Sequence, residues 1–271
     1  MNTPKISIVT PCLNDARYLE QTLRSIHGQK YSHLEHIVVD GGSTDGSVEI
    51  IQSYADRLAW WVSEPDDGHA DALWKGMQHV TGDIVTWVCS NDLLLPGSLQ
   101  AVADYFASHP NVEWAAGHGL AIDEQSRVKA RIWSVPFSYW SLMFWLPWGA
   151  CQPAVFMRRS ALEAVGGINR LRHVSVDTEL FVRLSQRGRA ARIDAFLGAL
   201  RYHDTSQTNR LAQQVQQADE EIRQQHGLPR LPRLVRRVLY SLYDRRFRSY
   251  QWWREQTCGD GGYPVGYQTA G

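Results

Sequence analysis

The chain has 271 residues, enough for one large hydrophobic core or one core with an appendage. Its 28 basic and 28 acidic residues give zero formal net charge, so we expect no binding to nucleic acid. The four cysteines form no CxxC pair, which argues against a structural zinc site and suggests a reducing, cytoplasmic environment. We expect no signal peptide, and no membrane span because no run of about 18 apolar residues occurs.

The first half of the chain alternates short apolar strands with amphipathic helices. Helices are expected where apolar residues recur every three or four positions, as in Leu99–Phe106. This alternation predicts a mostly parallel sheet covered by helices on both faces. The strands expected here are Ile6–Val9, His36–Val39, Trp60–Val62 and Ile84–Val88.

The pattern loosens after residue 112. A short helix is expected at Ser160–Val165 and a longer one from about Asp177. From about Ser206 the sequence becomes Gln-rich and then Arg-rich, so we divide the chain into a catalytic domain, residues 1–205, and a helical C-terminal extension, residues 206–271. The strands expected in this half are Val112–Ala116, Gly119–Ile122 and Ala154–Met157, with a turn at Asp123–Ser126.

Polar clusters follow three of the expected strands. They are Pro11–Asn14, the glycine-rich segment from Asp40 to Gly46, and Ser90–Asn91–Asp92. Ligands of open α/β sheets lie just outside the carboxyl ends of the strands, and a carboxylate such as Asp92 can hold Mg²⁺ or Mn²⁺ against a diphosphate. Each cluster also has a plainer interpretation as a strand-to-helix turn with a capping residue. We favour function for Asp92, because folding requires no acid after a buried strand.

Two further residues permit both a structural and a functional interpretation. Asp177 lies where a helix begins, and an acid there is often only a cap that matches the helix dipole. The alternative is a general base that deprotonates an acceptor hydroxyl. A lone histidine such as His203 is usually structural or exposed, although a neutral imidazole also binds metals.

Six segments in order resemble the inverting family 2 glycosyltransferases, which have the GT-A fold for nucleotide-diphospho-sugars. The resemblance runs from about Lys5 to Ser206 and is specific because the six segments keep their order and spacing. They read SIVTPCLN, HIVVDGGSTDGS, SEPDDGHADALWKG, TGDIVTWVCSND, FMRRSALEAVGGI and VDTELFVRLSQRG.

The resemblance implies a role for individual residues. Asp177 would be the catalytic base, while Asp92 and His203 would bind a divalent Mn²⁺ or Mg²⁺ ion. Gln152 and Glu179 are assigned to the acceptor side, and Ser206 to a region that closes over the diphosphate. The residues expected along the nucleotide-sugar are Pro11, Leu13, Asn14, Asp40, Gly68, Asp71, Lys75, Ser90 and Asn91.

Three positions depart from the family pattern. Leu13 stands where an aromatic residue commonly packs on the base. Gly41 replaces the second acid of the common Asp-Asp-Gly-Ser, which leaves the nucleotide undetermined. Asn91 replaces the first of two aspartates in the metal motif, which reduces the negative charge near the metal.

We therefore expect a metal-dependent, inverting glycosyltransferase that moves a sugar from a nucleotide-diphospho-sugar to a saccharide or lipid-linked acceptor, in surface polysaccharide or glycolipid biosynthesis. The alternative is a non-catalytic relative that binds nucleotide-sugar, which Asn91 favours. The Arg-rich segment Leu228–Glu255 also carries tryptophans and leucines, a composition that suits a helix lying on an anionic membrane surface at the cytoplasmic face. It equally suits a helix packed on the catalytic domain or on a second subunit.

Overall fold

The computed structural model describes residues 3–134, 151–188, 190–202 and 212–227, together with single positions 232, 234, 235 and 238. His203, Ser206 and most of the Arg-rich extension lie outside these residues, as does the expected domain boundary at 205/206. Within the described part, no helix combines the length and apolar character needed to cross a membrane.

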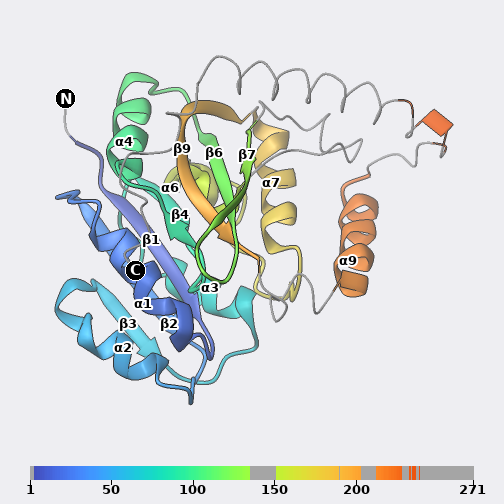
Figure 1. The fold of residues 1–271 in the computed structure, drawn as a ribbon. Helices are drawn as coiled ribbons and strands as arrows, with labels where there is room; N and C mark the ends of the chain where they lie inside the picture. The colour runs from blue at the N-terminus through green and yellow to red at the C-terminus, as the bar shows by residue number, and fades with distance from the viewer. Residues whose placement is uncertain are drawn as a thin grey trace.

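The first half of the chain folds as the alternation of apolar runs predicts. Four parallel strands lie side by side in the order β3-β2-β1-β4, and helices connect them (Figure 1). The elements are β1 (Ile6–Cys12), α1 (Ala16–His27), β2 (Leu34–Asp40), α2 (Ser47–Ser53), η1 (Ala55–Arg57), β3 (Trp60–Ser63), α3 (His69–Met77) and β4 (Ile84–Trp87).

The second half extends the same sheet with mixed strand directions. Strand β8 runs antiparallel between β4 and β6, β9 runs parallel to β6, and β5 and β7 pair antiparallel with β9 and β6. Nine strands of the described residues thus form one sheet. The elements are β5 (Leu93–Leu94), α4 (Ser98–Ser108), β6 (Trp114–Ile122), β7 (Val128–Ile132), η2 (Gln152–Ala154), β8 (Val155–Arg158), α6 (Arg159–Ala164), α7 (Val176–Arg187), β9 (Ala191–Arg201) and α9 (Ala212–Gln225).

Two hydrophobic cores lie on opposite faces of the sheet. On one face, α3 and α7 bury Leu73 and Phe181 against Val9 of β1. On the other face, α4 packs Phe106 against Ile8 of the same strand, so neighbouring β1 residues serve different cores. Burial of strand β4 on both faces matches its largely apolar sequence.

Close backbone packing explains why the strands in the second half of the sheet were harder to predict from the sequence. The expected strands Val112–Ala116 and Gly119–Ile122 are one strand, β6, with irregular register beside β9. A side chain at Gly119 would meet Cys151 Sγ at 2.2 Å, and one at Gly198 would meet the Pro153 carbonyl carbon at 2.9 Å. Glycine lets β6 and β9 approach η2, and its presence hides the strand pattern.

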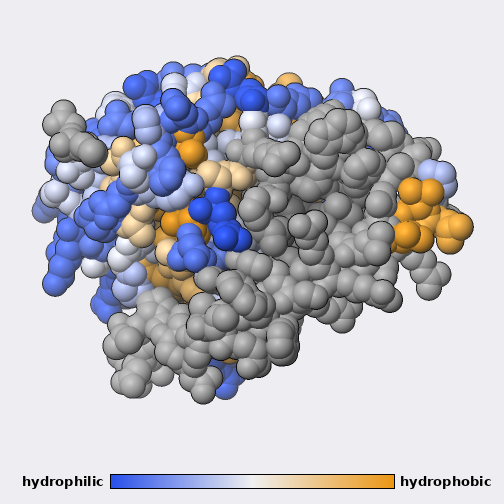
Figure 2. Space-filling view, turned by 90° about the horizontal axis from the view of Figure 1, so that it is seen from above, coloured by the Kyte–Doolittle hydropathy of each residue, from blue (hydrophilic) through white to orange (hydrophobic). Residues whose placement is uncertain are grey.

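The surface of the described residues is largely polar on the face seen from above. In the coloured part of Figure 2, hydrophilic side chains predominate toward the left and upper edges with hydrophobic ones between them, and a separate hydrophobic patch lies at the right edge. In the C-terminal extension, the described helical residues Leu234, Val235 and Val238 are 74%, 43% and 52% exposed.

Candidate active site

The Ser90–Asn91–Asp92 segment follows β4 and is fastened by α1. The Thr22 hydroxyl lies 2.7 Å from the Ser90 carbonyl oxygen and 2.8 Å from the Asp92 carbonyl oxygen. The Ser90 hydroxyl donates to Asp15 Oδ2 at 2.6 Å. Because Ser90 and Asp92 are both buried, these contacts fix the loop rather than leave it in solvent.

Strand β9 holds the same segment from the other side through Arg201, which is 4% exposed. The Arg201 amide donates to Asp92 Oδ1 at 2.9 Å, and its Nε donates to the Asn91 carbonyl oxygen at 2.8 Å. The guanidinium also donates to the Asp123 carbonyl oxygen at 3.0 Å. Arg201 thereby ties the end of β9, the β6–β7 turn and the Asp92 loop together.

The charges of three carboxylates act on the thiol of Cys89. Burial raises the pKa of Cys89 well above its ordinary value, and the charges of Asp92, Asp177 and Asp15 raise it further. Burial also raises the pKa of Asp92 to about 7, against the opposing effects of the Arg201 amide and charge, with a smaller contribution from Asp15. Asp92 and Asp177, the two principal expected acids, thus both act electrostatically on the Cys89 thiol.

Asp177 lies in the first turn of α7, where its Oδ1 accepts the Thr178 amide at 2.8 Å. Burial raises the pKa of this half-buried carboxyl, a shift that makes it a better proton acceptor. Glu179 differs, because Arg183 binds both of its carboxylate oxygens, at 2.7 and 2.6 Å. Of the two acids, Asp177 is the one without a cationic partner in the described residues.

The loop after β2 is organised by Asp40, which has no exposed surface. Its Oδ2 accepts the Gly42 and Ser43 amides and the Ser63 hydroxyl, while its Oδ1 accepts the Ser43 hydroxyl. Asn14 joins this loop to β1, because its Oδ1 accepts the Thr44 amide at 2.9 Å. Direct contact of Asp40 with a nucleotide stays a prediction, and its described role is to shape the loop.

The loop before α3 is held in a similar way. Gly68 has φ 105°, a left-handed conformation that favours glycine, and no atom lies within 4 Å of the side chain it lacks. Buried Asp71 pairs with Arg170 at 2.5 Å and accepts the Asp67 amide at 3.1 Å. Lys75 lies 2.7 Å from Glu64, so its described partner is a carboxylate.

Three further residues expected at the site, Pro11, Leu13 and Gln152, differ in their burial and hydrogen bonding. Pro11 is buried in β1 opposite Val39, whereas Leu13 is 54% exposed just beyond the strand. The Gln152 side-chain amide donates to the Trp87 carbonyl oxygen at 2.9 Å, which places it beside the end of β4. Its buried Oε1 accepts no hydrogen bond from the described residues.

The donor chemistry fits a divalent cation shared with a ligand, not a cation enclosed by protein. No group of three histidine, cysteine, aspartate or glutamate side chains that could hold a metal occurs among the described residues. Asp92 nevertheless offers a buried carboxylate whose charge is disfavoured by its surroundings. Mg²⁺ is commonly held by one or two carboxylates together with substrate phosphates, so Asp92 fits this arrangement.

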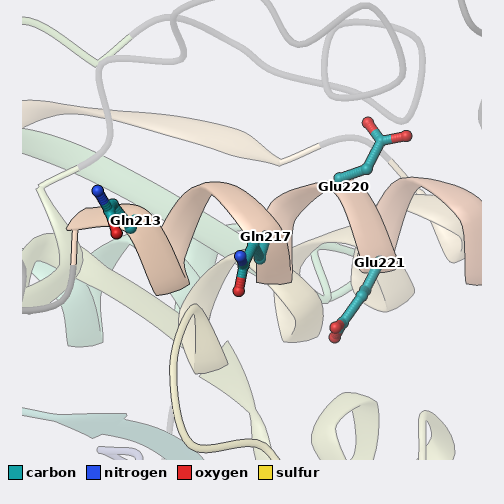
Figure 3. A pocket seen from close by; sticks show the side chains of 4 residues that line it. All are labelled: Gln213, Gln217, Glu220 and Glu221. Carbon is teal, nitrogen blue, oxygen red and sulfur yellow. The ribbon is translucent and has the colours of Figure 1, made fainter.

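An open hollow beside α9 lies apart from these residues in the sequence. It is lined by Gln213, Gln217, Glu220 and Glu221, and Figure 3 shows Glu220 and Glu221 projecting in different directions from the helix. None of the four belongs to the expected site, and none of these four described residues is cationic.

Comparison with known proteins agrees with this geometry. Residues 7–166 match the model of glycosyl transferase family 2. Since the match spans more than half of the chain, this protein belongs to glycosyl transferase family 2.

Curated relatives are glycosyltransferases. An uncharacterised glycosyltransferase of Mycobacterium tuberculosis is 38% identical over 92 residues, which are 34% of this chain and 35% of the relative. A PGL/p-HBAD biosynthesis glycosyltransferase of Mycobacterium bovis is 28% identical over 187 residues, 68% of this chain and 70% of the relative. The chain thus spans about a third of the first relative and more than two thirds of the second.

Solved structures share the fold. S. aureus TarS 1-349 in complex with UDP has a TM-score of 0.61 at 16% identity, covering 90% of this chain and 72% of that one. The mannosyltransferase PcManGT from Pyrobaculum calidifontis, in complex with GDP-Man and Mn²⁺, has a TM-score of 0.59 at 19% identity, covering 89% and 70%. The expected GT-A fold with helices flanking the sheet is confirmed, although the sheet is mixed and not mostly parallel, because β5, β7 and β8 pair antiparallel.

Several residues of this site escaped the sequence analysis. Asp15 had the sequence signal of a helix cap, and Arg201 lies in a strand that was not predicted. Thr22 looked like an ordinary helical residue, although its hydroxyl bonds the loop that carries Asp92. No local pattern distinguishes such residues, because their partners lie 68 to 110 positions away.

Proposed function

We propose that this protein is an inverting glycosyltransferase that moves a sugar from a nucleotide-diphospho-sugar to an acceptor hydroxyl. The observation that supports this most is electrostatic: the charges of Asp92, which follows β4, and of Asp177, at the start of α7, both act on the thiol of Cys89. One carboxylate is suited to the diphosphate end of the donor and the other to the attacking hydroxyl.

Asp177 acts as the general base in this proposal. Its carboxylate takes the proton of the acceptor hydroxyl while that oxygen bonds to the anomeric carbon, and the bond from that carbon to the diphosphate breaks. Because the attack is a single displacement, the anomeric configuration inverts. Its raised pKa, caused by burial, brings the carboxyl nearer to neutral pH, where a base is most effective.

Asp92 would hold a divalent cation, Mn²⁺ or Mg²⁺, with His203 as the other expected ligand. Such a cation, when bound, neutralises charge on the diphosphate leaving group as a Lewis acid. Thr22 and Arg201 keep the Asp92 loop in place for this role. Gln152 is assigned to the acceptor, because a hydroxyl would supply its Oε1 with the donor that the described residues lack.

The acceptor is proposed to be a saccharide or a lipid-linked molecule of surface polysaccharide or glycolipid biosynthesis. The name of the M. bovis relative, a PGL/p-HBAD biosynthesis glycosyltransferase, supports this class. A cytoplasmic protein bound peripherally at the inner face of the membrane would reach such an acceptor. The exposed hydrophobic residues Leu234 and Val238 support this location.

The experiment is to incubate the purified protein with a panel of nucleotide sugars, Mn²⁺ and candidate acceptors, and to identify products by mass spectrometry. Nuclear magnetic resonance of the new anomeric proton then reports inversion or retention. We expect released nucleotide diphosphate and an inverted product, and Asp177→Asn serves as the matched inactive variant. A retained configuration would contradict the proposed mechanism.

A second candidate is a non-catalytic protein that binds nucleotide-sugar, which the replacement of an acid by Asn91 supports. Donor hydrolysis with Mn²⁺ separates the two functions. Tight donor binding without hydrolysis or transfer, across the whole panel, would favour the binding protein.

A further inference from the structure

The carboxylate of Asp66 covers the position where a side chain at residue 41 would begin. A Cβ built on Gly41 would lie 2.7 Å from Asp66 Oδ2, 3.0 Å from Cγ and 3.1 Å from Oδ1. Gly41 is not among the residues with positive φ, so its backbone conformation would accept a side chain. What excludes a side chain at position 41 is therefore the space taken by Asp66.

Asp40, the neighbouring acid, is already engaged in shaping its own loop. It is fully buried, and its two carboxylate oxygens accept hydrogen bonds from Gly42, Ser43 and Ser63. Turning Asp40 toward a ligand would leave two loop amides without their acceptor, which is costly for buried groups. The acid available at the carboxyl end of β2 is therefore Asp66, which reaches it from the loop after β3.

Asp66 itself is half-buried, and only one of its two carboxylate oxygens accepts a hydrogen bond from the described residues. Its Oδ1 accepts the Gly68 amide at 2.8 Å, whereas its Oδ2 accepts no hydrogen bond from the described residues. Burial raises the pKa of this carboxyl, partly offset by the Gly68 amide and the charge of Lys75. A hydrogen-bond donor placed against Oδ2 would stabilise the charged form.

An apolar side chain borders the same place. The Gly41 amide donates to the Cys12 carbonyl oxygen at 2.9 Å, so Leu13 and Gly41 lie at neighbouring strand ends. Leu13 is 54% exposed, although a leucine gains from being covered. A flat ring resting on Leu13 with one N–H directed at an acceptor would satisfy both residues.

We propose that Asp66 selects the nucleobase of the donor, and that this base is a pyrimidine with an imide N–H, as in uracil. The imide presents a single N–H, which matches the single unused oxygen of Asp66. Guanine presents two adjacent donors, and the second donor would compete with the Gly68 amide for Oδ1. This inference rests on the proposed function, because it names the nucleotide of the same donor.

The test compares three probes by calorimetry in the presence of Mg²⁺: UDP, GDP and UDP methylated at the imide nitrogen. We expect the full-length chain to bind UDP about 10- to 100-fold more tightly than methylated UDP, the usual range for a hydrogen bond to a charged group. Asp66→Ala should bind UDP and methylated UDP equally weakly. Asp67→Ala removes an exposed acid from the same loop and should keep the discrimination of the unaltered chain.

A second pair of variants distinguishes loss of the contact with the base from loss of the folded structure. Gly41→Asp should abolish UDP binding, because its side chain collides with Asp66. Adding Asp66→Ala to Gly41→Asp removes the collision and places an acid at the same spot, so UDP binding and discrimination against methylated UDP should return.

The outcomes separate this inference from the proposed function. Discrimination that survives Asp66→Ala, or a preference for GDP over UDP, overturns the role of Asp66 while leaving a nucleotide-sugar enzyme intact. Failure of the unaltered chain to bind any nucleotide diphosphate overturns both.

Discussion

The backbone amide of Arg201 donates a hydrogen bond to Oδ1 of Asp92 at 2.9 Å, between residues 109 positions apart. The contact joins the last residue of β9 to the acid that follows β4. The Arg201 amide does not bind Oδ2, the other oxygen of the Asp92 carboxylate. The position of the proposed metal ligand is therefore set by the far half of the sheet.

Asp92→Ala should abolish dependence on divalent metal and most turnover. A loss of roughly 100-fold or more is expected when a main stabiliser of transition-state charge is removed. Thermal unfolding gives a readout independent of activity: Mn²⁺ should raise the melting temperature of the unaltered chain and leave that of the variant unchanged. Near-normal turnover in Asp92→Ala would refute the assignment, whereas Asn91→Asp should be tolerated and should tighten metal binding.

Asp177→Asn keeps the shape of the side chain but removes its ability to accept a proton. Turnover should fall about 100- to 10,000-fold, the usual contribution of a general base, while donor binding measured by calorimetry stays unchanged. Glu179→Gln is the comparison variant, and it should act mainly on stability because it breaks the pair with Arg183. If Glu179→Gln costs more turnover than Asp177→Asn, the base has been assigned to the wrong carboxylate.

Arg201→Lys should weaken metal binding without touching the metal ligand. Lysine cannot reproduce the contacts of the guanidinium to the Asn91 and Asp123 carbonyl oxygens and the Ser126 hydroxyl. The half-saturating Mn²⁺ concentration should rise about tenfold, as for other residues that orient a ligand. Arg127→Ala is the matched control, because Arg127 pairs with Asp123 from an exposed position and should leave this concentration unchanged.

Glu35→Gln should destabilise the protein in a pH-dependent way. Burial by itself would raise the pKa of Glu35, but hydrogen bonds from Lys5, Ser7 and Thr81 outweigh it and lower the pKa to about 2. A depressed pKa stabilises the fold above the ordinary value of 4.5, and this contribution disappears as the pH falls toward 2.

Chemical denaturation should therefore show a loss of about 1–3 kcal/mol for Glu35→Gln at pH 7 that vanishes near pH 2. Glu163→Gln, which disrupts an exposed pair with Arg159, should change stability by less than about 1 kcal/mol at either pH. A pH-independent loss in Glu35→Gln would contradict the role of its charge.

The C-terminal extension should bind anionic membranes. Full-length protein should pellet with anionic liposomes, and the double substitution Leu234→Ser and Val238→Ser should leave it in the supernatant, because both side chains are exposed four residues apart. High salt should weaken the binding of the unaltered chain. Equal sedimentation of both proteins, or aggregation of the variant, would favour packing on protein instead.

The parallel half of the fold could be predicted because each strand carries its own signal. Ile6–Val9 and Ile84–Val88 are largely apolar runs, each with one small hydroxyl residue, and a strand buried on both faces needs no more than that. Strand β9 could not be found this way. Its sequence contains Asp194 and Gly198, and it is a strand because β6 and η2 approach it closely.

The candidate site likewise contains residues that could be predicted from the sequence and residues that could not. Asp92 and Asp177 could be singled out, because acids after a strand and at a helix start are local patterns. The missing acid at Gly41 also stood out in the sequence. Asp66, whose carboxylate occupies the space beside Gly41, is 25 residues further along the chain, and no local pattern marks it. Residues whose role depends on a distant neighbour require coordinates.

The hydrogen bond between Arg201 and Asp92 also has a consequence for synthesis on the ribosome. Strands β1 to β4 and their helices are complete once Trp87 has emerged, and their contacts join nearby segments. The Asp92 carboxylate, by contrast, lacks the amide that binds its Oδ1 until Arg201 has been translated and β9 has entered the sheet beside β6. A nascent chain can thus assemble its first four strands early, while the proposed cation site must wait for β9.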